Sequence, residues 1–284
     1  MKQITIISGK GGTGKTTITA SLACLAKNYV VADCDVDAAD LHLLLDPQVK
    51  QRYDFYSGKG YTIDLEKCVQ CGMCRDLCRY NAINNLYEID PIACDACGAC
   101  FNVCPAQAVV EKENCAGEYY ISNTKYNMPM IHANLYIAED NSGKLVAQVR
   151  KEARKKATEV NADYILIDGP PGIGCPVNAA IVGVDLALIV TEPTLSGIHD
   201  LLRVIELAKH FKIKSKVVIN KYDINLENTK RIESICSEHG SDCISKIPYD
   251  DVIVKSLIAG KTIADYDPSH SICAEIEKIW EGIL

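Results

Sequence analysis

The segment GKGGTGKT, residues 9–16, follows a short apolar stretch and precedes a helical pattern. Its spacing, G-x-x-x-x-G-K-[ST] between strand and helix, is that of a phosphate-binding loop. The glycines let backbone N–H groups turn around phosphate oxygens, and the helix presents its positive end to them. A glycine-rich turn without a ligand is the alternative, which the strand, helix and lysine together disfavour. The residues expected to bind a nucleotide phosphate are Gly9, Gly11, Gly12, Thr13, Gly14, Lys15, Thr16 and Thr17.

Apolar, β-branched segments alternate with helical patterns along most of the 284 residues. Such alternation predicts a parallel sheet covered on both faces by helices. Apolar residues make up 48% of the chain and charged residues 24%, as in ordinary globular proteins. The expected strands are residues 4–8, 30–35, 164–168, 186–190 and 216–220, and helices are expected within 18–27, 144–160 and 197–211.

Two cysteine runs interrupt this alternation between residues 59 and 118. CVQCGMCRDLC begins at residue 68, CDACGACFNVC begins at residue 94, and both have the spacing C-x2-C-x2-C-x3-C. This is the bacterial two-cluster ferredoxin pattern, in which the fourth cysteine of each run ligates the other cluster. Two zinc sites are the alternative, but zinc needs only paired C-x2-C units. We expect two [4Fe–4S] clusters, one on Cys68, Cys71, Cys74 and Cys104, the other on Cys94, Cys97, Cys100 and Cys78.

The remaining seven of the fifteen cysteines are scattered along the chain. For most of them we expect small buried side chains. Cys175 lies seven residues beyond Asp168, where two copies in a dimer could share a metal ion, and a buried structural role is the favoured interpretation.

The phosphate loop carries an extra lysine, Lys10. With it, KGGTGKTT resembles the deviant Walker A loop of the MinD, ParA, Mrp and nitrogenase iron protein superfamily. The resemblance implies an ATP-sandwiched homodimer in which Lys10 reaches the partner's nucleotide and Lys15 contacts the terminal phosphates. Taken alone, Lys10 could equally be a solvated loop lysine.

The whole chain resembles superfamily members that contain an inserted ferredoxin domain. The fold expected is α/β, a parallel-sheet deviant Walker A P-loop NTPase with an inserted small α+β bacterial 2[4Fe–4S] ferredoxin domain. We place the ATPase domain at residues 1–58 and 119–284, and the ferredoxin domain at 59–118. One departure from the ferredoxin pattern is Arg79, where a proline usually follows the fourth cysteine.

Two carboxylates complete the site that the resemblance implies. Asp35, in the sequence DCD, matches the family residue that positions the attacking water, with Asp37 as a nearby substitute. Asp168, in DGPPG, resembles the Walker B aspartate that holds Mg²⁺ through water, and Thr16 is the expected direct magnesium ligand. For either aspartate, a helix cap or a turn is the simpler alternative.

The sequence NKYD, residues 220–223, raises the question of which base is bound. Its N-K-x-D spacing is that by which GTPases read guanine. In the MinD-like family the asparagine here contacts adenine instead, and this implies that Asn220 helps to bind ATP. GTP is the alternative.

Charge and hydropathy limit the other partners. A net charge of −7 disfavours nucleic acid, and no apolar stretch reaches the length of a spanning helix. We therefore expect a cytoplasmic protein. The C-terminal pattern SICAEIEKIWEGIL places apolar residues on one helical face between glutamates, so we expect it to pack on its own core and not on a membrane.

Three tasks could join an ATP switch to iron–sulfur clusters. The favoured one is an ATPase whose dimer motion controls electron transfer to a client metalloprotein or redox partner, in metallocofactor assembly. The second is a carrier that delivers clusters to apo-proteins. The third is a MinD-like positioning ATPase whose clusters sense redox state.

Overall fold

The computed structural model describes residues 1–137, 139 and 142–284, which form two compact units. The first comprises Met1–Tyr53, Tyr119–Asn134 and Ser142–Leu284, and the second Asp54–Glu118 and Leu135–Asn141. The predicted domain boundaries fall inside two long strands, β3 (Gln48–Ile63) and β4 (Val109–Asn123). The assignment of an inserted domain at 59–118 therefore stays a prediction. The range 119–284 assigned to the ATPase domain includes three residues, 138, 140 and 141, that lie outside the described ones.

One sheet runs in the order β3-β4-β5-β2-β6-β1-β7-β8-β9 among the described residues. The pairings from β5 through β9 are parallel, as the alternating pattern predicts. The sequence did not indicate β3, β4, β5 (Pro129–Leu135) or β9 (Asp242–Ile247). The five predicted strands are confirmed as β1 (Lys2–Ser8), β2 (Tyr29–Asp33), β6 (Tyr164–Pro171), β7 (Leu186–Thr191) and β8 (Lys214–Asn220).

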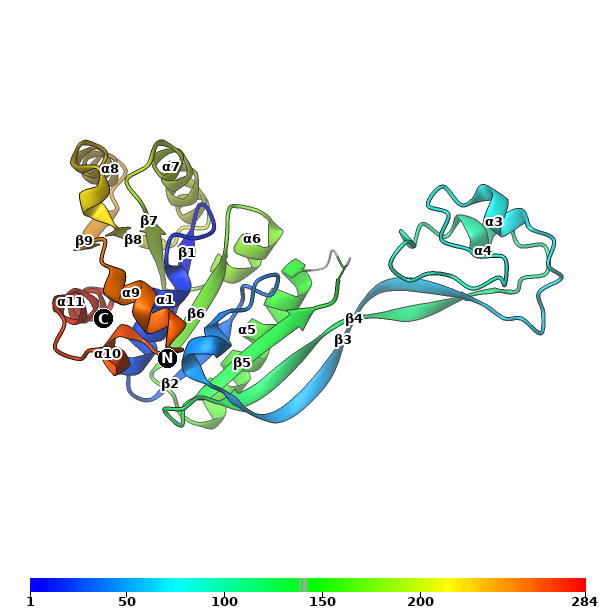
Figure 1. The fold of residues 1–284 in the computed structure, drawn as a ribbon, viewed down its shortest axis with the longest axis horizontal. Coiled ribbons are helices and arrows are strands. Elements are labelled where there is room, and N and C mark those ends of the chain that lie inside the picture. The colour runs from blue at the N-terminus through cyan, green and yellow to red at the C-terminus, as the bar shows by residue number, and fades with distance from the viewer. Residues whose placement is uncertain (138, 140–141) are drawn as a thin grey trace. The chain divides into compact units, whose positions relative to one another are not determined.

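Helices cover both faces of the parallel part of the sheet (Figure 1). The alternation of strand side chains requires this, because Ile4 and Ile6 of β1 point to one face and Ile7 to the other, and all three are fully buried. The helices on the Ile4 face are α1 (Lys15–Leu25), α2 (Leu41–Leu45), α10 (Ile263–Tyr266) and α11 (Ser271–Ile283), and α9 (Asp251–Ile258) packs against α10. The helices on the opposite face are α5 (Ser142–Glu159), α6 (Cys175–Ile181), α7 (Leu195–His210) and α8 (Leu226–Glu238). A short 3₁₀ helix, η1 (Tyr222–Ile224), precedes α8.

The second unit repeats one local structure. Each cysteine run contains a single short helix, α3 (Met73–Leu77) or α4 (Ala99–Val103). Gly72 and Gly98 precede these helices with φ of +82° and +72°, a backbone conformation that glycine adopts without strain. The sequence repeat therefore folds as a structural repeat. The buried residues of its small core are Ile63, Cys74, Ile83, Tyr87, Ala108 and Val109.

The last helix, α11, packs on the first unit as the sequence predicts. Ile276 and Ile279 are almost fully buried in the same apolar cluster as the strands, and Trp280 meets Tyr164 edge to face at 5.3 Å. In the part of the chain that the structure describes, no helix is long and apolar enough to cross a membrane.

Replacing Ile279, which is fully buried, by alanine should lower the free energy of unfolding by about 2–5 kcal/mol, because it removes apolar contacts and leaves a cavity. Urea denaturation would measure the change. Ile258→Ala is the matched control, since that side chain is 82% exposed, and its effect should stay within about 0.5 kcal/mol. Equal effects of the two substitutions would contradict the packing of α11.

Candidate nucleotide site and cysteine cavities

The phosphate loop connects β1 to α1, at the carboxyl end of the parallel strands. Strand β1 lies between β6 and β7, where connections leave in opposite directions, the usual ligand position in such sheets. Gly14 has φ of +92°, and a Cβ there would lie 2.6 Å from Nδ2 of Asn220. That amide donates to the Thr13 carbonyl at 2.9 Å. The structure thus brings the predicted Asn220 against the loop, and only glycine fits at position 14.

Lys15, the first residue of α1, is only 6% exposed. Its ammonium lies 3.1 Å from Oδ2 of Asp35. Burial raises the pKa of Asp35, and the positive charge of Lys15 offsets that increase only in part. The two predicted catalytic residues therefore form an ion pair with each other. The Lys15 ammonium that would bind a phosphate is thus paired with Asp35.

Asp168 is fully buried near the end of β6, and two threonines of α1 donate hydrogen bonds to its carboxylate. Thr16 donates to one carboxylate oxygen at 2.7 Å and Thr19 to the other at 3.0 Å. Beside it, Asp33 is 1% exposed and accepts the amide N–H of Asp35 at one oxygen, while its other oxygen is buried without a partner among the described residues. Burial, followed by the charge of Asp168, raises the pKa of Asp33 well above its usual value.

These oxygen donors suit Mg²⁺, which prefers carboxylates, hydroxyls and water. The orphaned oxygen of Asp33 points to a missing positive charge at this edge of the sheet. However, no group of three or more His, Cys, Asp or Glu side chains in the described residues is arranged to hold a metal ion. Magnesium binding by Thr16 and Asp168 therefore stays a prediction.

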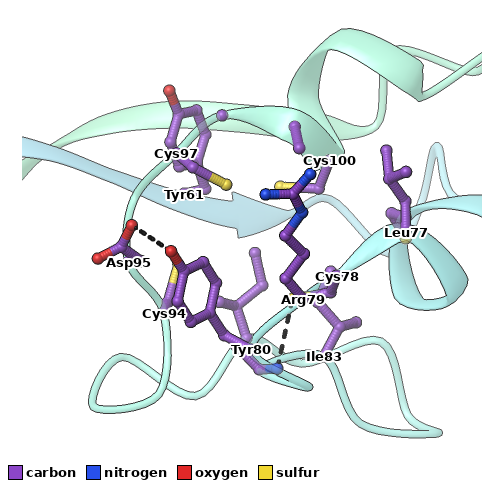
Figure 2. Close-up of a pocket in the computed structure, with 15 residues that line it drawn as sticks. Tyr61, Leu77, Cys78, Arg79, Tyr80, Ile83, Cys94, Asp95, Cys97 and Cys100 are labelled. Carbon is purple, nitrogen blue, oxygen red and sulfur yellow. Dashed lines mark hydrogen bonds between the residues drawn. The ribbon is translucent and has the colours of Figure 1, made fainter.

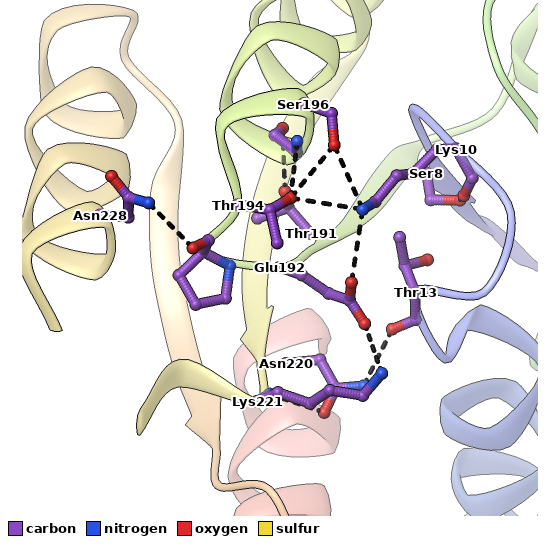
Figure 3. A network of polar contacts seen from close by, with 12 residues as sticks. Ser8, Lys10, Thr13, Thr191, Glu192, Thr194, Ser196, Asn220, Lys221 and Asn228 are labelled. Atoms are coloured by element: carbon purple, nitrogen blue, oxygen red, sulfur yellow. Dashed lines mark hydrogen bonds and ion pairs between the residues drawn. The ribbon is translucent and has the colours of Figure 1, made fainter. Parts of the chain in front are cut away.

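Lys10 is held by its own chain (Figure 3). Its ammonium lies 3.5 Å from Glu192, 3.3 Å from Oγ1 of Thr194 and 3.4 Å from Oγ of Ser196. Glu192 is 8% exposed and also accepts from Lys221 at 2.6 Å. Lys10 is thus partly exposed but contacts a buried carboxylate and two hydroxyls, and its role at a partner's nucleotide stays a prediction.

The residues of NKYD are engaged within the protein. Lys221 pairs with Glu192, and Oδ1 of Asp223 accepts the backbone N–H of Tyr249 at 2.7 Å. Guanine readout by an N-K-x-D sequence needs the aspartate for the base. Asp223 instead fixes the loop of residues 248–250, between β9 and α9.

The first cysteine cavity, cavity A, contains the whole second set predicted to bind a cluster (Figure 2). It measures about 300 Å³, and Cys74 of the other set also reaches it. The predicted set that lines it consists of Cys78, Cys94, Cys97 and Cys100.

The second cysteine cavity, cavity B, contains the whole first predicted set. Its volume is about 10 Å³, so a cubane there would require the four thiols to move apart. Each thiolate of a cubane binds a different iron, so four sulfurs surround a volume instead of converging on one ion. The set that lines cavity B consists of Cys68, Cys71, Cys74 and Cys104.

Backbone N–H groups face the fourth cysteine of each run. The N–H of Ala82 donates to Sγ of Cys78 at 3.4 Å, and that of Ala108 to Sγ of Cys104 at 3.2 Å. Burial raises the pKa of Cys104, but several backbone N–H groups, Ala108 first, lower it by more, and the net pKa falls below the usual value. The thiolate is the form that ligates metal, so this environment suits a ligand.

The scattered cysteines follow the predicted burial only in part. Cys34, Cys236 and Cys273 are buried, whereas Cys175 is exposed. The favoured interpretation of Cys175 as a buried structural cysteine is therefore wrong: it is exposed as the first residue of α6, after the turn that follows β6.

Comparison with known proteins identifies the family of the chain. The model of the CobQ/CobB/MinD/ParA nucleotide binding domain matches residues 4–263. The chain belongs to this family. An uncharacterised protein of Methanocaldococcus jannaschii is 35% identical over 284 residues, covering 99% of this chain and 96% of its own. The septum site-determining protein MinD of Bacillus subtilis is 25% identical over 290 residues, covering 99% and 88%.

Solved structures agree on the fold. MinD from Pyrococcus horikoshii, complexed with Mg-ADP, superposes with a TM-score of 0.60 at 20% identity and covers 99% of this chain and 95% of that one. MinD from Aquifex aeolicus gives a TM-score of 0.59 at 23% identity, covering 100% and 96%. The α/β P-loop fold with a mainly parallel sheet is thus established.

Sequence reasoning missed three residues of the site. Thr19 lies one helical turn after Thr16, and that spacing could have placed it beside Asp168. Glu192 and Asp33 stand at the carboxyl ends of parallel strands, where ligand sites gather. Their positions at the ends of predicted strands could have indicated that both residues belong to the site.

Asp35→Asn should increase affinity for nucleotide about tenfold, because it frees the Lys15 ammonium from a charged competitor for phosphate. Titration with a fluorescent ATP analogue would measure the dissociation constant. Lys15→Ala is the opposing control and should weaken binding by about a hundredfold or more. Weaker binding by the Asp35→Asn variant would show that Asp35 supports the loop instead of competing for it.

Asp33→Asn should flatten the dependence of thermal stability on pH. The raised folded-state pKa of Asp33 means that stability is greatest below its ordinary pKa and is lost as pH rises through the raised value. Thermal unfolding midpoints from about pH 4 to pH 8, without nucleotide, would test this. Asp242→Asn, at an exposed position of β9, should leave the slope unchanged. A wild-type slope retained in Asp33→Asn would exclude Asp33 as its source.

Proposed function

We propose that this chain is an ATP-hydrolysing iron–sulfur protein, an ATP-driven homodimer switch that controls electron transfer to a client metalloprotein during metallocofactor assembly. One observation carries the iron–sulfur part: cavities A and B are each lined by one of the two crossover cysteine sets. Zinc sites built from paired C-x2-C units give no reason for the fourth cysteine of each run to lie with the other run.

The nucleotide half of the proposal rests on the family and on the site geometry. Lys15 would bind the terminal phosphates, Thr16 and Asp168 would hold Mg²⁺, and Asp35 would orient the attacking water once phosphate releases it from Lys15. Lys10 would leave Glu192 to reach the nucleotide of the second protomer.

ATP is the nucleotide we propose. Asn220 lies against the phosphate loop, and Asp223 is occupied by the backbone of Tyr249, so the guanine-reading group of an N-K-x-D sequence is not presented. The Pyrococcus relative, whose structure contains Mg-ADP, supports an adenine nucleotide by analogy.

The cluster half rests on chemistry that this chain's thiols can support. Two [4Fe–4S] clusters, when bound, would supply one-electron carriers at low potential. The cysteines hold them, the N–H groups of Ala82 and Ala108 stabilise thiolate sulfur, and the apolar core around Ile63 and Val109 excludes water. Complete ligand sets within one chain favour permanent carriers over cargo in transit to an apo-protein.

A positioning role is the second candidate, since B. subtilis MinD, at 25% identity, is named a septum site-determining protein. A membrane-binding C-terminal helix would need an apolar face available to lipid. In this chain Ile276 and Ile279 of α11 are buried against the first unit. That packing favours the electron-transfer proposal.

Anaerobic purification followed by metal analysis tests the proposal. We expect about eight irons per chain, and Cys97→Ser should remove about half of them. Cys115→Ser is the matched control, since Cys115 belongs to the same unit but lines neither cavity. Bound zinc in place of iron, or equal iron in both variants, would refute the cluster assignment.

The coupling requires a second measurement. ATP should shift a cluster potential in the wild type but not in Lys15→Ala, which should lose ATPase activity and keep its iron. A potential indifferent to ATP, with clusters leaving for an apo-acceptor, would replace gated electron transfer by cluster delivery.

A further inference from the structure

Cavities A and B have different linings. Besides its thiols, cavity A is lined by charged and phenolic groups, among them Arg79, Asp95, Tyr61 and Tyr80. Cavity B carries no charged side chain among its lining residues, and the hydroxyl of its one tyrosine, Tyr87, donates to the carbonyl of Gln70. Its other lining residues are Ile63, Val69, Met73, Pro105, Ala106, Ala108 and Val109.

The hydrogen bonds to sulfur differ between the two cavities. Cys78 in cavity A and Cys104 in cavity B each accept one N–H from the residue four positions on, at 3.4 and 3.2 Å. Further backbone N–H groups act on Cys104. Such bonds raise the potential of a cluster and here favour cavity B, so a higher potential in cavity A has to come from its charged lining.

Arg79 is the cation of cavity A. It directly follows Cys78, and Figure 2 shows its side chain extending across the cavity in the direction of Cys100. Within the described residues it has no hydrogen-bond or ion-pair partner, so its charge is not committed elsewhere. At the equivalent position after Cys104, cavity B has Pro105.

Asp95 carries the opposing charge in cavity A. Its carboxylate accepts the hydroxyl of Tyr80 at 2.8 Å, and Figure 2 shows this pair at the edge of the cavity, away from the guanidinium of Arg79. Asp95 and Arg79 are both exposed to water, which screens the two charges alike, but the hydrogen bond from Tyr80 disperses part of the negative charge of Asp95, and Arg79 has no such partner among the described residues. We therefore take the positive charge as the stronger influence on cavity A.

We propose that Arg79 gives the cluster of cavity A a higher reduction potential than the cluster of cavity B, so that an electron entering the chain is held on the cluster of cavity A. This rests on the cluster half of the proposed function. Arg79 stabilises the extra negative charge that reduction brings, while the apolar lining of cavity B disfavours it. One electron from an external low-potential donor reduces either cluster, and one electron then passes from cavity B to cavity A without proton transfer or bond change.

An anaerobic redox titration followed by electron paramagnetic resonance tests this, with dithionite as the reductant. The wild type should show two one-electron steps. Arg79→Gln should lower the ratio of reduced to oxidised cluster in the higher-potential step about tenfold at a given ambient potential, equivalent to about 59 mV. Arg79→Lys, which keeps the charge, should restore most of the separation between the steps.

Controls assign the steps and the cause. Cys97→Ser, in cavity A, should alter the signal of the higher step, and Cys71→Ser, in cavity B, that of the lower. Lys112→Ala removes an equal charge from the same unit without touching either cavity, and both steps should stay in place.

Two outcomes would overturn the proposal. One is a pair of equal potentials in the wild type, which needs no variant to be stable. The other is an iron-replete Arg79→Gln protein whose two steps are unmoved. Absence of iron in the wild type would instead refute the proposed function, so the two failures are distinguishable.

Discussion

The hydrogen bonds from Thr16 and Thr19 to Asp168 fix the first helix to the end of β6. Asp168 pairs in register with Asp33 of β2 and with Ile6 of β1, so parallel pairing places two carboxylates on the same edge as the phosphate loop. Lys15, one residue before Thr16, then meets Asp35. The nucleotide site follows from this single junction between a helix start and three strand ends.

The parts of the fold that local patterns encode could be read from the sequence. β-branched apolar runs gave the five central strands, and the glycine loop placed α1 after β1. Gly14 illustrates why: its positive φ and the 2.6 Å approach of Asn220 leave room for no side chain. A backbone conformation that only glycine can adopt requires a glycine at that position, and the sequence therefore predicts it directly.

Contacts between distant segments could not be read in this way. Glu192 meets Lys10 across about 180 residues, and Asn220 reaches Thr13 across more than 200. The strands β3 and β4 were missed because polar residues such as Lys50 and Glu113 are frequent in them and interrupt the apolar pattern. The crossed cysteine sets stay a prediction of cluster ligands, although each set lines one cavity, with Cys74 lining both.

One oxygen of Asp33 is buried without a partner among the described residues, and burial, followed by repulsion from Asp168, raises the pKa of Asp33; burial also raises the pKa of Asp168. A charge left buried without a partner destabilises the fold. Mg²⁺ with a nucleotide would relieve that repulsion while phosphate takes Lys15 from Asp35. Binding would therefore stabilise the first unit and release Asp35 in the same step, so that the free energy of ligand binding is linked to the rearrangement required for hydrolysis.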